Sequence, residues 1–140
     1  MTTLVITAIA SDHAGVELKT KLVAETGALD LGPNDAASVD YPDYANALCE
    51  WVLTAPGRKG ILICGSGIGM SIAANRHKHV RAALVHNAEL ATLARQHNDA
   101  NVLCLGARFV TIDQATACGK AFLNTDFEGG HHAKRVEKLG

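Results

Sequence analysis

Aromatic side chains are scarce in this sequence, since 4% of its 140 residues are Phe, Trp or Tyr, and only three residues are proline. Because 48% of the residues are hydrophobic, aliphatic side chains must fill the interior, which favours an α/β fold with helices packed closely on a sheet. The formal net charge is −1, so there is no basic excess, and we expect no nucleic-acid partner. A chain of this length is expected to form a single domain over residues 1–140.

Long apolar runs and secretion signals are also missing. No stretch approaches the roughly 20 apolar residues needed to cross a bilayer, so we expect no membrane partner. Residues 1–3 place no basic side chain ahead of the first apolar run, which favours a cytoplasmic protein. The four cysteines have no CxxC or other metal-ligand spacing. We expect three of them to be reduced, buried thiols: Cys49, Cys104 and Cys118.

Apolar runs alternate with helical patterns along the chain. Five strands are predicted, at residues 4–10, 28–31, 61–64, 81–85 and 102–105. Apolar strands separated by helices predict a doubly wound, Rossmann-like, five-stranded parallel sheet with helices on both faces. With the strand order 2-1-3-4-5, a ligand would bind where the order reverses, between strands one and three.

Several residues predict where the helices begin and end. Gly27 is placed to stop the first helix, and Pro42 to open the next. Asn87 is a good N-cap, while Thr111 and Gln114 have the spacing of a capping box. A last helix, at about residues 128–139, has too little apolar surface to bury alone, so we expect it to pack on a second subunit.

The most informative segment is the run ILICGSGIG at residues 61–69. An apolar strand ends at Cys64 and opens into the alternating glycines Gly65, Gly67 and Gly69, and a helix-compatible segment follows from Met70. Bare backbone N–H groups and a helix N-terminus would therefore lie beside a potential nucleophile or base. This arrangement suits phosphate binding or stabilisation of an oxyanion.

The glycine loop does not match the nucleotide-binding fingerprints. Its spacing is G-x-G-x-G rather than G-x-G-x-x-G, and it lacks the Gly-Lys-Ser/Thr ending of a P-loop, so NAD and ATP are poorly supported. Two structural alternatives stay open: the glycines serve only a tight turn, and Cys64 is a small buried residue that closes a strand. The helix N-terminus after Cys64 opposes the second alternative, because it stabilises a thiolate.

Two histidine-bearing segments differ from the polar surroundings of the other histidines. His97 ends a predicted helix just before the last strand, and we expect its side chain to reach the carboxyl edge of the sheet. The sequence Gly-Gly-His-His at residues 129–132 lies close to Arg135. Adjacent histidines rarely aim at one ion, so His131 and His132 make a weak metal site, and we predict no metal.

Six segments together resemble the type B ribose-5-phosphate isomerase family, which also includes galactose-6-phosphate isomerase subunits. They run in the same order over nearly the whole chain and are highly specific as a set. These segments are SDHAG at residues 11–15, DYP at 40–42, CGSGIG at 64–69, SIAAN at 71–75, RQHNDAN at 95–101 and GAR at 106–108.

The resemblance implies an aldose–ketose isomerase of the pentose phosphate pathway, which interconverts ribose 5-phosphate and ribulose 5-phosphate without a metal or an organic cofactor. It implies that Cys64 is the base that moves a proton between C1 and C2. His97 would help open the sugar ring, with Asp12 near the ring oxygen. Ser66 and the loop N–H groups would hold the enediolate.

Further substrate contacts and the assembly are implied by the same resemblance. Family members are dimers, or tetramers built from dimers, with sites at the interface between subunits. The phosphate would be held by His13, Arg108 and Arg135, some of them from the partner. The other positions implied to line the substrate site are Tyr41, Gly65, Gly67, Ile68, Gly69 and Asn98.

One position departs from the family pattern. Many members have Gly-Gly-Arg-His where this chain has Gly-Gly-His131-His132, so His131 replaces an arginine that grips phosphate. Arginine is always charged and bidentate, whereas histidine carries a partial charge at pH 7. This favours weaker phosphate binding or another sugar, of the allose or galactose 6-phosphate type. A non-catalytic phosphate-binding module is the alternative class, and a thiol redox protein lacks a nearby resolving cysteine.

Overall fold

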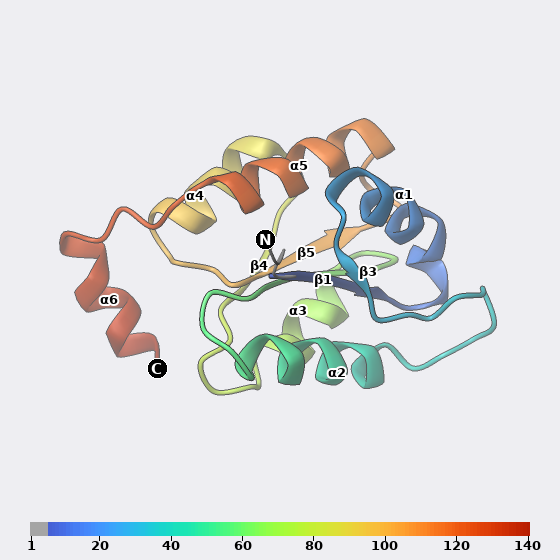
Figure 1. Cartoon of the computed structure of the whole chain (residues 1–140), viewed down its shortest axis with the longest axis horizontal. Coiled ribbons are helices and arrows are strands. Elements are labelled where there is room, and N and C mark those ends of the chain that lie inside the picture. The colour runs from blue at the N-terminus through green and yellow to red at the C-terminus, as the bar shows by residue number, and fades with distance from the viewer. Residues whose placement is uncertain (1–5) are drawn as a thin grey trace, which may run out of the picture.

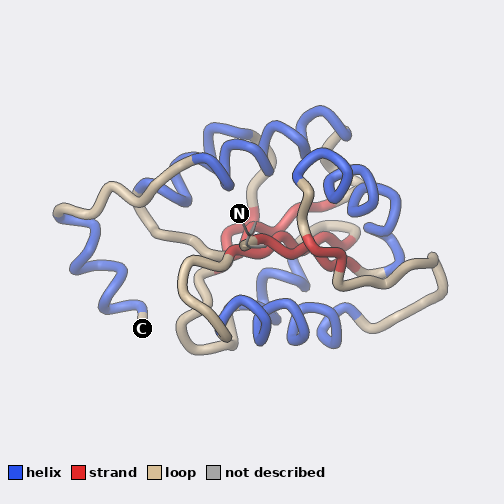
Figure 2. Tube along the Cα trace, viewed as in Figure 1, coloured by secondary structure: helices blue, strands red, loops and turns tan. Residues whose placement is uncertain are grey.

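The computed structural model describes residues 6–140 and is built on a parallel five-stranded sheet with helices on both faces (Figures 1 and 2). The predicted fold class is confirmed, although Leu4 and Val5 of the first predicted strand lie outside the described residues. The strands are β1 (Thr7–Ser11), β2 (Leu29–Asp30), β3 (Lys59–Cys64), β4 (Ala82–Leu84) and β5 (Val102–Gly106). The helices are η1 (His13–Gly15), α1 (Val16–Thr26), α2 (Tyr41–Leu53), α3 (Ile68–Ala74), α4 (Ala88–Gln96), α5 (Ile112–Asn124) and α6 (His131–Leu139).

The strand order is β2-β1-β3-β5-β4, so the predicted order 2-1-3-4-5 is wrong at its end. Strand β5 pairs with β3, and β4 pairs with the far side of β5. All five residues of β5 are buried, whereas the three residues of β4 are only partly buried. The shorter and more solvent-exposed strand, β4, therefore lies at the edge of the sheet. The order still reverses between β1 and β3, as predicted.

Two layers of helices cover the sheet, with α1, α4 and α5 on one face and α2 and α3 on the other (Figure 1). Alternate strand residues feed the two layers: Ile9 and Ile61 pack with Phe122 of α5, and Leu62 and Cys64 pack with the α2–α3 layer. Aliphatic side chains fill most of both cores, as the composition predicts. None of the helices within residues 6–140 is long and apolar enough to cross a bilayer.

The predicted helix signals are found where the sequence places them. Gly27, at φ 70°, ends α1 and donates its N–H to Val23 at 2.9 Å. Asn87 caps α4 by accepting the N–H of Leu90 at 2.9 Å, and the capping box of α5 is reciprocal. Helix α6 begins three residues later than predicted and lies apart from the two layers, with none of its residues fully buried (Figure 1).

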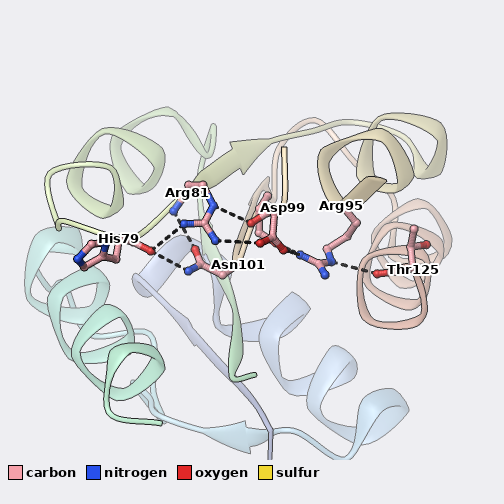
Figure 3. A network of polar contacts seen from close by, with 7 residues as sticks. His79, Arg81, Arg95, Asp99, Asn101 and Thr125 are labelled. Carbon is pink, nitrogen blue, oxygen red and sulfur yellow. Dashed lines mark hydrogen bonds and ion pairs between the residues drawn. The ribbon is translucent and has the colours of Figure 1, made fainter. Parts of the chain in front are cut away.

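A polar network fixes the turn between α4 and β5 (Figure 3). The buried Arg95 donates to the carboxylate of Asp99 at 2.8 Å and to the backbone carbonyls of Ala100 and Thr125 at 2.8 and 3.0 Å. Arg81 donates to the carbonyl of Asp99 at 2.8 Å. The two arginines hold Asp99 at φ 47°, and with it the turn that carries residues 97 and 98.

Candidate active site

The loop after β3 places a backbone donor on the sulfur of Cys64. The N–H of Gly67 points at Sγ, with a nitrogen–sulfur distance of 3.1 Å. Gly67 has φ 80°, and a Cβ at this position would lie 3.0 Å from the carbonyl carbon of Leu105. Packing therefore requires this glycine, and the same backbone conformation aims its N–H at the thiol.

The loop after β5 locks the glycine loop in place. The N–H of Ala107 donates to the carbonyl of Cys64 at 2.8 Å, and that of Arg108 to the carbonyl of Gly65 at 3.0 Å. Gly106 lies so close to Ser66 that a Cβ would come within 2.6 Å of the Ser66 carbonyl carbon. The guanidinium of Arg108 lies beside Gly65, with Cζ 3.4 Å from where a Cβ would stand.

Three more predicted site residues lie at this edge. Asp12 follows β1; its N–H donates to the carbonyl of Ile63 at 3.0 Å, and its Oδ1 caps η1 by accepting the N–H of Ala14 at 2.9 Å. His13 accepts the N–H of Val39 on Nδ1 at 3.3 Å. The ring of Tyr41 packs on Gly69, where a Cβ would lie 2.7 Å from Tyr41 Cε1.

We call these residues, at the carboxyl ends of β1, β3 and β5, the carboxyl-edge group. It consists of Asp12, His13, Tyr41, Cys64, Gly65, Ser66, Gly67, Ile68, Gly69 and Arg108. The structure thus brings together ten of the predicted site residues, from four separate segments. Backbone N–H groups, one thiol and one guanidinium give this edge the means to bind an anion and to move a proton.

The expectation that His97 reaches the carboxyl edge is wrong. Helices that connect parallel strands run back across the sheet, and α4 begins at the carboxyl edge with its N-cap Asn87. Its nine residues carry the chain back by about 14 Å, at about 1.5 Å per residue, so the C-cap His97 lies at the amino ends of the strands. In Figure 1, α6 and the end of α4 lie far from α1 and the carboxyl end of β1.

Four predicted residues form a second group at that opposite end, which we call the amino-edge group: His97, Asn98, His131 and Arg135. His97 stacks on His132, with ring centroids 4.3 Å apart and planes 15° apart, and His131 lies 4.0 Å from His132. Arg135 donates to the carbonyl of His131 at 3.2 Å.

Glu128 and His132 belong to the surroundings of His97, although the sequence did not single them out together. Glu128 Oε1 lies 3.8 Å from His97 Nε2 and 3.7 Å from His132 Nε2. The pKa of His132 is lowered, first by desolvation and then by the neighbouring His131 and His97, while Glu128 acts in the opposite direction. The spacing of Glu128 and His132, four residues apart, is the one local signal of their proximity.

Cys64 is reached poorly from within one chain. Its exposed fraction is 5%, and it lines none of the three cavities described for residues 6–140.

The other thiols are buried and unpaired, as predicted. Burial raises the pKa of Cys49 to about 12 and also raises the pKa of Cys104 and Cys118. Within one chain, the carboxyl-edge group with Cys64 and the amino-edge group with His97 lie at opposite ends of the sheet.

Comparison with known proteins gives a consistent likeness. The family model described as Ribose/Galactose Isomerase matches residues 7–139. The probable ribose-5-phosphate isomerase B of Mycoplasma pneumoniae is 47% identical over 137 residues, which cover 94% of this chain and 90% of that protein.

Two solved structures share both sequence and fold with the chain. Ribose 5-phosphate isomerase B from Anaplasma phagocytophilum has a TM-score of 0.89 and 48% identity, and the match covers 100% of both chains. The Mycoplasma genitalium enzyme with bound ribulose-5-phosphate has a TM-score of 0.91 and 44% identity, and the match covers 95% of this chain and 92% of that chain.

Proposed function

The chain belongs to the ribose/galactose isomerase family, and from this premise we propose that it interconverts ribose 5-phosphate and ribulose 5-phosphate by proton transfer between C1 and C2. A relative of the same fold is known with ribulose-5-phosphate bound, which supports this substrate. The observation that carries the chemistry is the Gly67 N–H aimed at Cys64 Sγ across 3.1 Å. We assign the activity to residues 1–140 as one isomerase domain.

In the proposed reaction the Cys64 thiolate removes the proton from C2 of the open-chain aldose, which leaves an enediolate, and returns it to C1, while the hydroxyl proton of O2 moves to O1. The Gly67 N–H donates to the sulfur and so stabilises the thiolate over the thiol. The first turn of α3 lies directly behind this loop, and its N–H groups favour negative charge as well. The three other thiols have raised pKa values, so burial keeps them protonated.

The charge that develops on the sugar oxygens is assigned to the glycine loop. Ser66 Oγ already accepts the N–H of Ile68 at 3.2 Å, and its own hydroxyl proton is left to donate to a sugar oxygen. Fixed donors of this kind typically contribute about 3 kcal/mol each to the stabilisation of an oxyanion transition state. We assign Asp12 to the ring oxygen and His13 and Arg108 to the phosphate; no metal or organic cofactor enters this reaction.

We propose that two chains complete each site, in a homodimer or a dimer of dimers. His97, which would open the ring, stands at the edge opposite Cys64, so a twofold axis that joins unlike edges would build two equal sites. Large apolar side chains near the glycine loop are exposed, including Ile68 at 54%, Ile72 at 53% and Phe109 at 65%. Their burial against a partner, together with the unburied α6, supports this assembly.

The phosphate end of the site distinguishes this chain within its family. His131 stands where arginine is usual, and we propose that it makes phosphate binding weaker and dependent on pH. The substrate alternative is therefore another sugar phosphate of the allose or galactose 6-phosphate type. Assays with a panel of phosphorylated sugars and their unphosphorylated counterparts, followed by detection of the ketose, decide between them. We place the enzyme in the cytoplasm.

Co-expression of two inactive variants tests the shared site. Cys64→Ala and His97→Ala chains, mixed in one dimer, leave one intact site, so random pairing should restore about a quarter of wild-type activity. As the control, a chain that carries both substitutions is paired with a wild-type chain, which leaves no intact site in the mixed dimer. If the control's mixed dimer is active and the Cys64→Ala/His97→Ala dimer is inactive, then each site takes Cys64 and His97 from the same chain, which contradicts the shared site.

A further inference from the structure

Three potential metal ligands from two distant segments meet at the amino edge. His97 is the C-cap of α4, Glu128 lies in the segment that leads into α6, and His132 lies in the first turn of α6. Their ligand atoms all lie within 4.8 Å of one another, and the carboxylate oxygen of Glu128 is 3.7 and 3.8 Å from the two imidazole Nε2 atoms. We call these three residues the His–Glu–His cluster.

The chemistry of this cluster matches a borderline divalent ion. Two imidazoles and one carboxylate are a ligand set that Zn²⁺ takes at three positions of a tetrahedron, with the fourth left to water. Bonds of about 2.0–2.1 Å at tetrahedral angles need ligand atoms about 3.3–3.4 Å apart. The distances from Glu128 Oε1 to the two Nε2 atoms are a few tenths of an ångström longer than this. Rotation of the exposed Glu128 side chain would shorten them.

Backbone contacts hold the cluster together without an ion. The N–H of Glu128 donates to the carbonyl of Gln96 at 3.1 Å, which fixes the α6 segment to the end of α4. The N–H of His132 donates to the carbonyl of Gly129 at 3.1 Å, and the ring of His132 stacks on that of His97. These backbone contacts bring the three side chains together. Because the stacked rings hold their Nε2 lone pairs nearly parallel, one imidazole must rotate out of the stack before both can bind the same ion.

We propose that His97, Glu128 and His132 form a binding site for a divalent transition-metal ion of the Zn²⁺ type. The site differs from the His131–His132 pair, for which the sequence indicates only a weak metal site, because His132 stacks on His97 of a distant segment. The ion takes the Nε2 lone pair of His97. If His97 opens the sugar ring, as in the proposed function, bound Zn²⁺ reversibly inhibits isomerisation and substrate competes with it.

Metal titration of the whole, chelator-treated protein tests the site. Equilibrium dialysis with Zn²⁺ should give one saturable site per chain, and Co²⁺ should show the visible absorption of a tetrahedral nitrogen–oxygen site. Glu128→Gln and, as a second variant, His132→Gln should weaken Zn²⁺ binding at least tenfold, by analogy with the effect of lost supporting ligands. Glu137→Gln, an exposed residue of α6, removes the same charge outside the cluster and should bind Zn²⁺ as the wild type does.

A thiol site is the competing explanation, and Cys64→Ala separates the two. If this variant keeps the Zn²⁺ site while Glu128→Gln and His132→Gln lose it, the cluster holds the ion. Wild-type affinity in both cluster variants, or loss of binding in Cys64→Ala, overturns the proposal. Binding is measured without turnover, so an inactive protein that binds Zn²⁺ contradicts the proposed isomerase alone, and an active protein without saturable binding contradicts the metal site alone.

Discussion

The substitution Gly67→Ala should cost both stability and activity, because one glycine serves packing and the thiol together. At φ 80° an alanine occupies the left-handed region, at a cost of about 1–2 kcal/mol. Its Cβ would also collide with a methyl group of Leu84 and lie 3.0 Å from the carbonyl carbon of Leu105. Overpacking of this kind typically costs about 1–3 kcal/mol, so we expect a total loss of about 2–5 kcal/mol.

Urea denaturation measures this loss, and steady-state kinetics measures the effect on turnover. A loss of this size should lower Tm by roughly 10 °C for a chain of this length. Relief of the collision shifts the loop, so the 3.1 Å contact from the Gly67 N–H to Cys64 Sγ lengthens and kcat falls.

Gly65→Ala is the matched control for stability. The Cβ there would make only ordinary contact, 3.4 Å from Arg108 Cζ, so the free energy of unfolding should change by less than about 1 kcal/mol. If Gly67→Ala unfolds at the wild-type urea concentration, or if the two variants lose equal stability, then neither the positive φ nor the contact with Leu84 governs this loop.

Three further predictions concern charged groups. Asp30→Asn should lower the free energy of unfolding by about 3–5 kcal/mol in urea denaturation, because Lys19, 1% exposed and 2.8 Å from Asp30, then keeps a buried charge without its partner; unchanged stability contradicts this. His131→Arg should lower KM for ribose 5-phosphate and leave kcat nearly unchanged, whereas an unaltered KM would put His131 outside the phosphate site. The pKa of His132 is lowered in the fold, so the unfolded chain binds the proton more readily and the fold loses stability as pH falls below about 6.5. NMR titration should give a midpoint for His132 below that value, and the amide protection of α6 should decline over the same pH range. A midpoint above about 6.5 contradicts the account.

Local features of this fold could be predicted because local residues encode them. The αL stop at Gly27, the Asn87 cap and the Thr111–Gln114 capping box depend on neighbours within four residues. The loop at Cys64 could be predicted for the same reason, since a strand, alternating glycines and a helix follow one another directly in the sequence.

Long-range features were harder to predict. Both strand orders satisfy the same apolar patterns, and the choice between β4 and β5 for the edge depends on how much of each strand the helices cover. His97 was predicted at the wrong edge because the helix that precedes it returns the chain to the amino ends of the strands, which the spacing of residues alone does not show. The contact of His97 with Glu128 and His132 joins segments that no local pattern relates.

Exchange of the substrate's C1 and C2 protons with D₂O tests the role of Cys64 most directly. Cys64→Ala, compared with wild type on ribose 5-phosphate and followed by NMR or mass spectrometry, should lose deuterium incorporation by about 10²–10⁴-fold, because the base is gone. The variant should keep its fold and its binding of ribulose 5-phosphate. Deuterium incorporation within a few-fold of the wild-type rate would contradict the assignment of Cys64 as the base.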